Sequence, residues 1–222
     1  WDLRHEAPLG ADGQPSRRTR GRFVVPGTYA VRLAVGETVH TRTLQVRMDP
    51  ALGIDPATRL ALDETLALQA ALVGAAAVAG ATVDTLRAHA GAVETLLEQT
   101  PSAPAALGEA ASALSAEARR LQVILDGPGS SGLAQQETVV PLASLVSRLY
   151  TSTESWTGPP TADQRGLTAR AHAELSGLVA DLRALIDDAL PALRRALDDA
   201  GLVWPAGDAP VLPDDLLPSF QP

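Results

Sequence analysis

Four arginines lie within six residues near the start of the chain, at Arg17, Arg18, Arg20 and Arg22. Guanidinium groups at this density could dock onto an acidic surface, including the chain's own helices, or bind a phosphate or an anionic glycan. All 18 basic residues of the chain are arginine, which is typical of a GC-rich coding sequence. Because this bias enriches arginine everywhere, a solvated loop is the simplest interpretation of the cluster.

Paired carboxylates are the second pattern with chemical potential. Glycoside hydrolysis needs two carboxylates about 5 or 6.5–9.5 Å apart across a sugar cleft. Adjacent residues of a helix point about 100° apart and are usually solvated, so the acid pairs of this chain do not predict a catalytic site. These pairs are Asp187–Asp188, Asp198–Asp199 and Asp214–Asp215.

Other catalytic and metal chemistries lack their residues. The chain has no cysteine and no lysine, which excludes thiol nucleophiles, cysteine-ligated metals and Schiff-base lysines. The segment Gly129-Ser130-Ser131-Gly132 lacks the spacing of a nucleophile elbow and indicates a linker. The histidines show no HExxH spacing; they are His5, His40, His89 and His172. We therefore predict no catalytic residue, no cofactor and no metal site.

Charge divides the chain near residue 50. Residues 1–50 hold eight arginines and five acids, for a net charge of +3, whereas residues 51–222 hold ten arginines and twenty-one acids, for a net charge of −11. Nucleic-acid binding requires a positive footprint, so the acidic part argues against such a partner.

The pattern of residues 1–50 is that of β-structure. Apolar residues alternate with other residues over 28–35 and again over 44–48, and a Gly36-Glu37 turn separates the two runs, which predicts a hairpin over 28–48. Short strands at 23–26 and near Trp1 would bring the count to three or four. That is about half of an immunoglobulin-like sandwich. Either the other half lies upstream, or this small sheet packs on the residues after 50.

The period becomes helical after Asp55, which can cap a helix that opens with Pro56. We expect helices over about 56–99, 104–125 and 141–156, and a long one opened by Thr161 and Gln164, with a kink near Pro191. Short connections predict an antiparallel four-helix bundle over 51–200, and alanine on the seams predicts close packing. Residues 201–222, with five prolines, should form an irregular tail. The fold class is thus α+β and mainly α.

One helix raises the question of a membrane. Thr65 to Val83 is a run of 19 residues without a charge, which is the length of a membrane span. Its residues are mostly alanine, glycine and threonine, and acids flank it on both sides. Alanine and glycine contribute little to insertion, so we expect a packed helix and no membrane span.

Three segments carry a resemblance to a known family: Trp1-Asp2-Leu3-Arg4, then Val25 to Leu33 (VPGTYAVRL), then Leu44 to Pro50 (LQVRMDP). They resemble the C-terminal region of bacterial secreted proteins built on BNR-repeat or sortilin-type β-propellers, often labelled glycosyl hydrolase or sialidase-like. The resemblance implies a partial Ig-like module that follows the propeller and precedes an alanine-rich helical region.

The resemblance also implies a function. We expect a non-catalytic structural or interaction module, secreted or periplasmic, that supports the upstream propeller of the same polypeptide or pairs with another copy of itself. The alternative is an accessory region of a glycoside hydrolase whose active site lies in that propeller. The chain begins at Trp1 and its only methionine is Met48, so we expect it to be part of a longer polypeptide.

Overall fold

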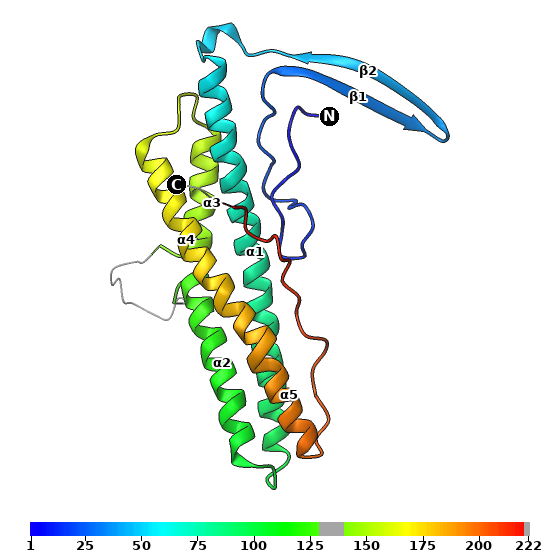
Figure 1. The fold of residues 1–222 in the computed structure, drawn as a ribbon, viewed down its shortest axis with the longest axis vertical. Helices are drawn as coiled ribbons and strands as arrows, with labels where there is room; N and C mark the ends of the chain where they lie inside the picture. The colour runs from blue at the N-terminus through cyan, green and yellow to red at the C-terminus, as the bar shows by residue number, and fades with distance from the viewer. Residues whose placement is uncertain (129–139, 220–222) are drawn as a thin grey trace.

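The computed structural model describes residues 1–128 and 140–219, and it confirms a mainly helical α+β fold. A hairpin of two strands precedes the helices, and a short 3₁₀ turn, Pro50–Leu52, joins the two parts. The longest helix, α1, is central, and α2, α3 and α4 pack against it (Figure 1). The elements are β1 (Gly27–Val35), β2 (Thr38–Val46), α1 (Pro56–Glu98), α2 (Ala105–Asp126), α3 (Leu142–Glu154), α4 (Ala162–Ala184) and α5 (Leu190–Asp199).

Two helices begin where the sequence predicts. The Asp55 carboxylate accepts hydrogen bonds from the backbone N–H groups of Ala57 and Thr58, both at 3.0 Å. The side-chain and backbone hydrogen bonds from Thr58 also lower the pKa of Asp55. At the start of α4, Thr161 and Gln164 form the reciprocal pair of a capping box, at 3.1 and 2.8 Å. Both signals are local, which is why the sequence reveals them.

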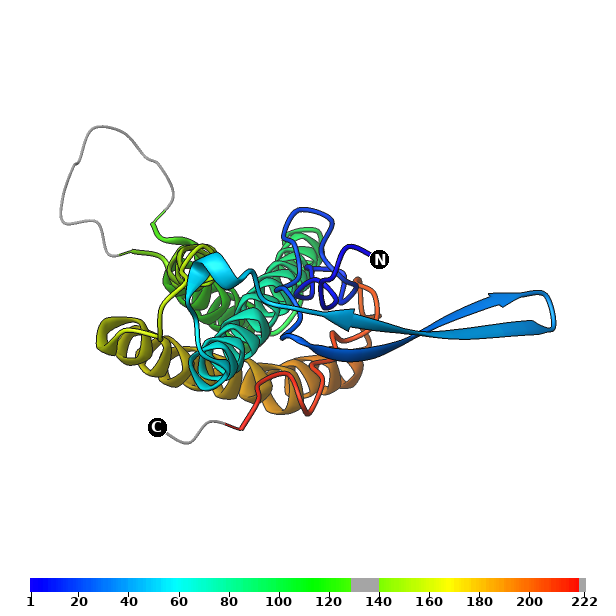
Figure 2. The same ribbon diagram turned by 90° about the horizontal axis from the view of Figure 1, so that it is seen from above.

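The helices do not alternate in direction as expected. α2 runs antiparallel to α1, and α3 then continues in the direction of α2 along the upper half of α1 (Figure 1). α4 and α5 return along the other side of α1. Seen from above, α1 lies between α3 and the rod of α4 and α5 (Figure 2). The predicted linker at 129–132 lies outside the described residues.

The sequence predicts a kink at Pro191, and the structure has a wide turn just before it. Residues Leu185–Ala189 form a π-helical turn (η2) that joins α4 to α5 in one continuous rod. Proline lacks an N–H and its ring collides with the carbonyl of the preceding turn. A π turn widens the backbone at that point, and the Leu190 N–H bonds to the Leu185 carbonyl.

Alanine and leucine share the core. Six alanines of α1 and α2 are almost fully buried, so these two helices approach closely, as the sequence predicts. The alanine-rich face of α1 is thus used inside the bundle, against the other helices. The buried alanines of the seam are Ala75, Ala76, Ala79, Ala90, Ala111 and Ala118.

The β part is smaller than expected. The described residues hold two strands and two isolated bridges, Arg4–Phe23 and Leu9–Pro15, in place of three or four strands. The first 26 residues follow the outside of α1 instead of pairing as a sheet. Leu9 lies so close to Gly74 that a Cβ at position 74 would be 3.0 Å from the Leu9 nitrogen. Within the described residues, the β part therefore consists of one hairpin and a segment packed on the helices.

The last described residues, 201–219, form an irregular segment that returns along the bundle (Figure 1). Leu216 is buried in the main core, and Trp204 packs edge-on against His89 of α1 with ring centroids 5.7 Å apart. Arg183 of α4 donates to the carbonyls of Pro213 and Asp214. The segment thus covers a side of the bundle that would otherwise be open.

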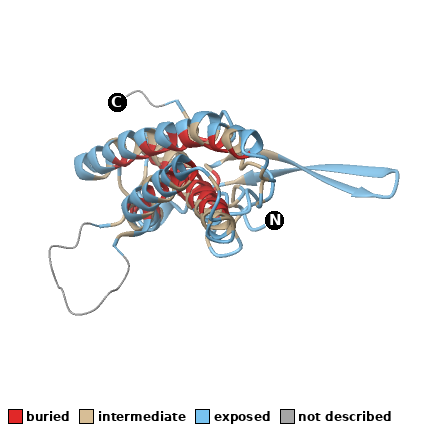
Figure 3. Ribbon diagram, turned by 90° about the horizontal axis from the view of Figure 1, so that it is seen from below, coloured by how far each residue is buried: buried red, intermediate tan, exposed pale blue. Residues whose placement is uncertain are grey.

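Helix α1 is long and apolar enough to cross a membrane by length and composition. In this fold, 56% of its most apolar window is buried inside the protein. The other helices cover it on several sides (Figure 3). This is the burial pattern of a core helix.

Candidate interaction surface

The hairpin projects away from the bundle as an arm (Figures 1 and 2). Val35 pairs with Thr38, so a two-residue turn, Gly36-Glu37, joins the strands. Gly36 has a φ of 58°, which fits a type II′ turn, a turn whose twist matches that of the strands. Each strand has nine residues, which makes the arm about 30 Å long.

The arm is exposed on both faces. All residues beyond its root are exposed, as the pale blue of Figure 3 shows. The register places most large apolar side chains on one side, which we call the apolar face. Its apolar side chains are those of Tyr29, Val31, Leu33, Val35, Leu44 and Val46, and Thr38, His40 and Arg42 lie on the same face. Leu33 and Val35 are 59% and 62% exposed, far more than large apolar residues in a covered sheet.

The opposite side of the arm is mainly polar. We call it the polar face; it consists of Thr28, Ala30, Arg32, Ala34, Val39, Thr41, Thr43 and Gln45. The two outer edges of the hairpin are also unpaired in the described structure. An isolated hairpin of two strands is only marginally stable in water. Beyond its root, where Trp1 packs on Tyr29, the arm thus offers an apolar face and two free edges that the other described residues of this chain leave uncovered.

The root of the arm, in contrast, is held firmly by Arg4. Its guanidinium lies 3.7 Å from the centroid of the Phe23 ring, and it donates to the Gly21 carbonyl at 2.5 Å. It also forms an ion pair with Glu154 at the end of α3. Both charged groups are largely buried, so the pair is well shielded from solvent. One side chain thus links the N-terminal segment, the approach to the arm and the bundle.

Aromatic residues complete the root. The Trp1 and Tyr29 rings lie 5.4 Å apart, and the Tyr29 hydroxyl donates to the Val25 carbonyl at 2.6 Å. A hollow of about 340 Å³ opens beside them between the N-terminal segment, the base of β2 and the start of α1, with Trp156 at its wall. Trp156 is 46% exposed. The apolar surface of the arm therefore continues onto the end of the bundle.

The four predicted arginines do not form one site. Arg22 donates to the Asp63 carboxylate of α1 at 2.8 Å, and both side chains are largely buried. Arg17, Arg18 and Arg20 lie outside this contact, and none of them forms an ion pair with another described residue. Arg22 thus docks on the chain's own acidic helix, and the other three remain on the surface.

Burial at this junction changes the acidity of two groups. The Tyr150 hydroxyl donates to the Arg20 carbonyl at 2.8 Å. Burial, with the nearby Glu154 carboxylate, raises the pKa of Tyr150 to about 12. Burial and the nearby Arg22 lower the pKa of His5. Both shifts accompany packing of the N-terminal segment, and neither group faces a cleft with a nucleophile.

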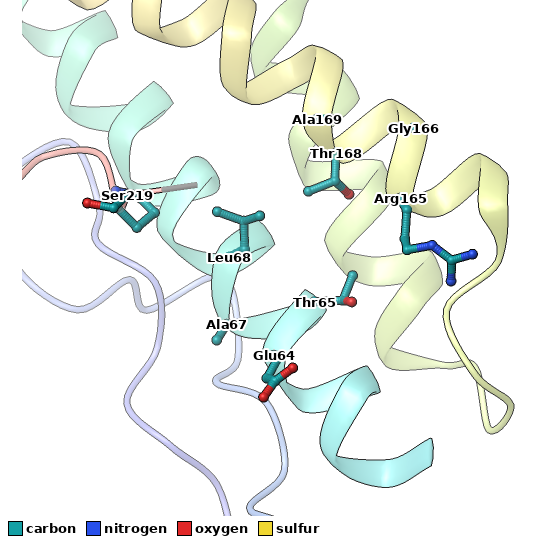
Figure 4. A pocket seen from close by; sticks show the side chains of 10 residues that line it. Glu64, Thr65, Ala67, Leu68, Arg165, Gly166, Thr168, Ala169 and Ser219 are labelled. Carbon is teal, nitrogen blue, oxygen red and sulfur yellow. The ribbon is translucent and has the colours of Figure 1, made fainter. Parts of the chain in front are cut away.

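A groove of about 710 Å³ lies between residues 64–68 of α1, the start of α4 and the C-terminal segment at Pro218 and Ser219 (Figure 4). Small residues such as Ala67, Gly166 and Ala169 line it, with Glu64 and Arg165 as its charged groups. Its size fits a small ligand, but no pair of reactive groups converges among its described lining residues.

Behind the groove, Gln69 donates to the Thr168 hydroxyl at 2.9 Å, and that hydroxyl donates to the Gln164 carbonyl at 2.6 Å. The Thr168 hydroxyl therefore donates its only proton to a carbonyl of its own helix, α4. The pair fastens α1 to α4, while the Gln69 side-chain oxygen has no hydrogen-bond partner among the described residues.

Catalytic groups are not assembled in the part of the chain that the structure describes. The three acid pairs are not brought together, and no group of three His, Cys, Asp or Glu side chains there could hold a metal ion. His40 is on the apolar face of the arm, opposite Leu33, and His5 is in the N-terminal segment. His89 and His172 are in α1 and α4.

The sequence did not reveal the root of the arm. Nothing in the spacing of Arg4 and Glu154 marks them as partners, because 150 residues separate them. The alternation of the hairpin was visible, but alternation does not say what covers the apolar face. The signal available in the sequence was the small number of predicted strands. Two strands alone have too little area to enclose a core, so an exposed face could be expected.

No protein-family model matches the sequence, and comparisons with curated proteins and with solved structures find no match. The exposed arm and its root are therefore the features that bear on function.

Proposed function

We propose that the chain is a non-catalytic structural and interaction module of an exported β-propeller protein. In this proposal the bundle is a rigid base, and the arm docks on the propeller located upstream in the same polypeptide. One observation carries it: a long hairpin stands clear of the bundle with its apolar face uncovered. Exposed apolar surface of this kind usually marks an interaction site.

The root of the arm supports this proposal. Trp1, Arg4 and Tyr29 belong to the segments that resemble propeller-linked proteins, and all three build the root. A docking element is most effective when its base is fixed, because less conformational entropy is then lost on binding. The ion pair of Arg4 with Glu154 provides such a fixed base.

The competing function is an accessory region of a glycoside hydrolase whose active site lies in the propeller. The arm would then hold a catalytic domain rather than a purely binding one. Assays of glycoside turnover by the longer polypeptide separate these two functions. Turnover of a glycoside by the 222-residue chain alone would contradict the non-catalytic assignment.

Self-association is a third outcome. The alanine-rich face of α1 is occupied inside the bundle, so in this case we place the second copy on the exposed apolar face of the arm. Light scattering over a range of concentrations measures this directly. A mass that doubles with concentration would support pairing, and a constant mass would contradict it.

Trypsin provides the main test, because Arg32 and Arg42 are exposed on the arm. We expect cleavage after these residues to be at least about tenfold slower in the polypeptide of the complete reading frame than in the 222-residue chain. Cleavage after the exposed Arg18 serves as the internal control and should be equally fast in both. Equal rates at all three arginines would contradict docking of the arm.

A further inference from the structure

We propose that the apolar face of the arm fits a partner surface that is itself apolar and places a carboxylate opposite Arg42, rather than the same face of a second copy. This inference rests on the proposed function and specifies the chemistry of the docking surface. Its basis is the distribution of charge over the two faces of the arm.

Each face carries one arginine, in very different surroundings. Arg42 lies on the apolar face, directly across from Val31, with Leu44 two residues further along its own strand. Arg32 lies on the polar face, across from Thr41. A partner that covers the apolar face must therefore cover a guanidinium at its middle, whereas Arg32 remains in solvent.

Covering a charge without a partner is unfavourable. An arginine that loses water needs a counter-charge with good hydrogen-bond geometry, and a carboxylate matches its planar fork. Neither strand of the arm contains an acidic residue; Glu37 belongs to the turn. The counter-charge for Arg42 must therefore come from the partner.

The same distribution opposes pairing between two copies of the face. Two identical apolar faces in contact would bring two Arg42 side chains into one interface and supply no carboxylate. Like charges in a poorly solvated interface disfavour that complex. A different surface, apolar and locally acidic, meets both requirements of the face.

Hydrogen exchange of residues 27–46 provides the test. The samples are the 222-residue chain and the polypeptide of the complete reading frame, the latter also as Arg42→Glu and Arg32→Glu. We expect the longer polypeptide to slow exchange in the arm at least about tenfold. Arg42→Glu should remove that protection, and the matched control Arg32→Glu should preserve it. Raising the salt concentration from about 0.05 to 0.5 M should weaken protection in the unmodified protein, because salt screens the ion pair.

The outcomes separate the two proposals. Absence of protection in the unmodified longer polypeptide would overturn the docking function itself. Protection that survives Arg42→Glu as well as it survives Arg32→Glu would overturn the acidic partner and leave the docking function intact. Protection that appears in the 222-residue chain and increases with its concentration would identify a second copy as the partner and overturn the inference. Circular dichroism of both variants should match the unmodified protein, since both arginines are exposed on the arm.

Discussion

Arg4 and Glu154 form an ion pair across 150 residues of sequence, and this pair fixes the N-terminal segment to the last turn of α3. The Arg4 side chain also covers the Phe23 ring and binds the Gly21 carbonyl, so one guanidinium holds three parts of the chain. Together with the Arg22–Asp63 ion pair, this contact fixes the segment that leads into the arm.

Arg4→Ala should lower the free energy of unfolding by about 2–3 kcal/mol, since charged hydrogen bonds and ring packing are lost together. Urea unfolding monitored by circular dichroism measures the change. A cycle with Glu154→Ala should show coupling between the two residues. Arg18→Ala is the matched control and should change stability by less than about 0.5 kcal/mol. Equal effects of the two arginine substitutions would contradict the role of Arg4.

Gly21→Ala should destabilise the protein, because a Cβ at position 21 would lie 1.9 Å from the His5 carbonyl oxygen. Relief of that collision requires the N-terminal segment to move, which we expect to cost roughly 1–3 kcal/mol. Gly108→Ala in α2 is the control: its Cβ would meet no described atom within 4 Å, so it should be neutral or stabilising. Thermal unfolding of the two variants checks the difference.

For the buried pair of Gln69 and Thr168, removing one partner should cost more stability than removing both. Thr168→Val leaves the Gln69 amide without its acceptor, at a cost of about 1–3 kcal/mol. Adding Gln69→Leu removes the stranded amide as well, so the double variant should recover much of the lost stability in urea unfolding. A double variant less stable than Thr168→Val alone would show that the pair does not behave as a hydrogen-bonded unit.

His89 should make stability depend on pH. Burial, with the nearby Arg194, lowers its pKa in the folded protein. The unfolded chain therefore takes up a proton near a pH of about 6.5 where the folded protein does not. The contribution of His89 to the free energy of unfolding is therefore fully present above that pH. It decreases as the pH falls toward the lowered pKa, by at most about 1.4 kcal/mol per pH unit.

His89→Phe retains an aromatic ring beside Trp204 and should flatten this dependence in urea titrations from about pH 7.5 to 5. His5, whose pKa is also lowered, remains in both proteins, so the difference between their slopes isolates His89. His40→Phe on the exposed arm is the control. An unchanged slope in His89→Phe would contradict the assignment.

Substitutions on the arm should not affect the bundle. Leu33→Lys with Val35→Lys should leave the stability of the helices within about 0.5 kcal/mol of the unmodified protein, because both residues are exposed. Leu72→Ala in the core should instead cost about 2–5 kcal/mol. Helical circular dichroism during urea unfolding compares them. A large loss in the arm variant would show that the apolar face already packs within this chain.

Local signals predicted much of the fold. Asp55 with Pro56, and Thr161 with Gln164, mark the starts of two helices within a few residues, and Gly36 marks the hairpin turn. Each of these acts through backbone hydrogen bonds between near neighbours, which sequence spacing records directly.

Long-range relationships were not predictable in this way. Periodicity identifies which face of an element is apolar but not which surface covers it, so the free arm could not be distinguished from a packed strand. The direction of α3 was missed for a similar reason, because short connections are expected to reverse a chain. The charges of the two regions suggest that one of the four arginines docks on an acidic helix. Which arginine does so depends on the path of the N-terminal segment along α1, and the structure shows that Arg22 binds Asp63.

The contact of Arg4 with Glu154 also sets an order of events during synthesis. Ribosomes add about 5–20 residues per second, so Arg4 is made roughly 8–30 s before its partner exists. Throughout that interval the N-terminal segment lacks its ion pair with the bundle, so the base of the arm has no fixed position. Completion of α3 thus fixes the base of the arm, while the apolar face beyond the root stays exposed to a partner afterwards.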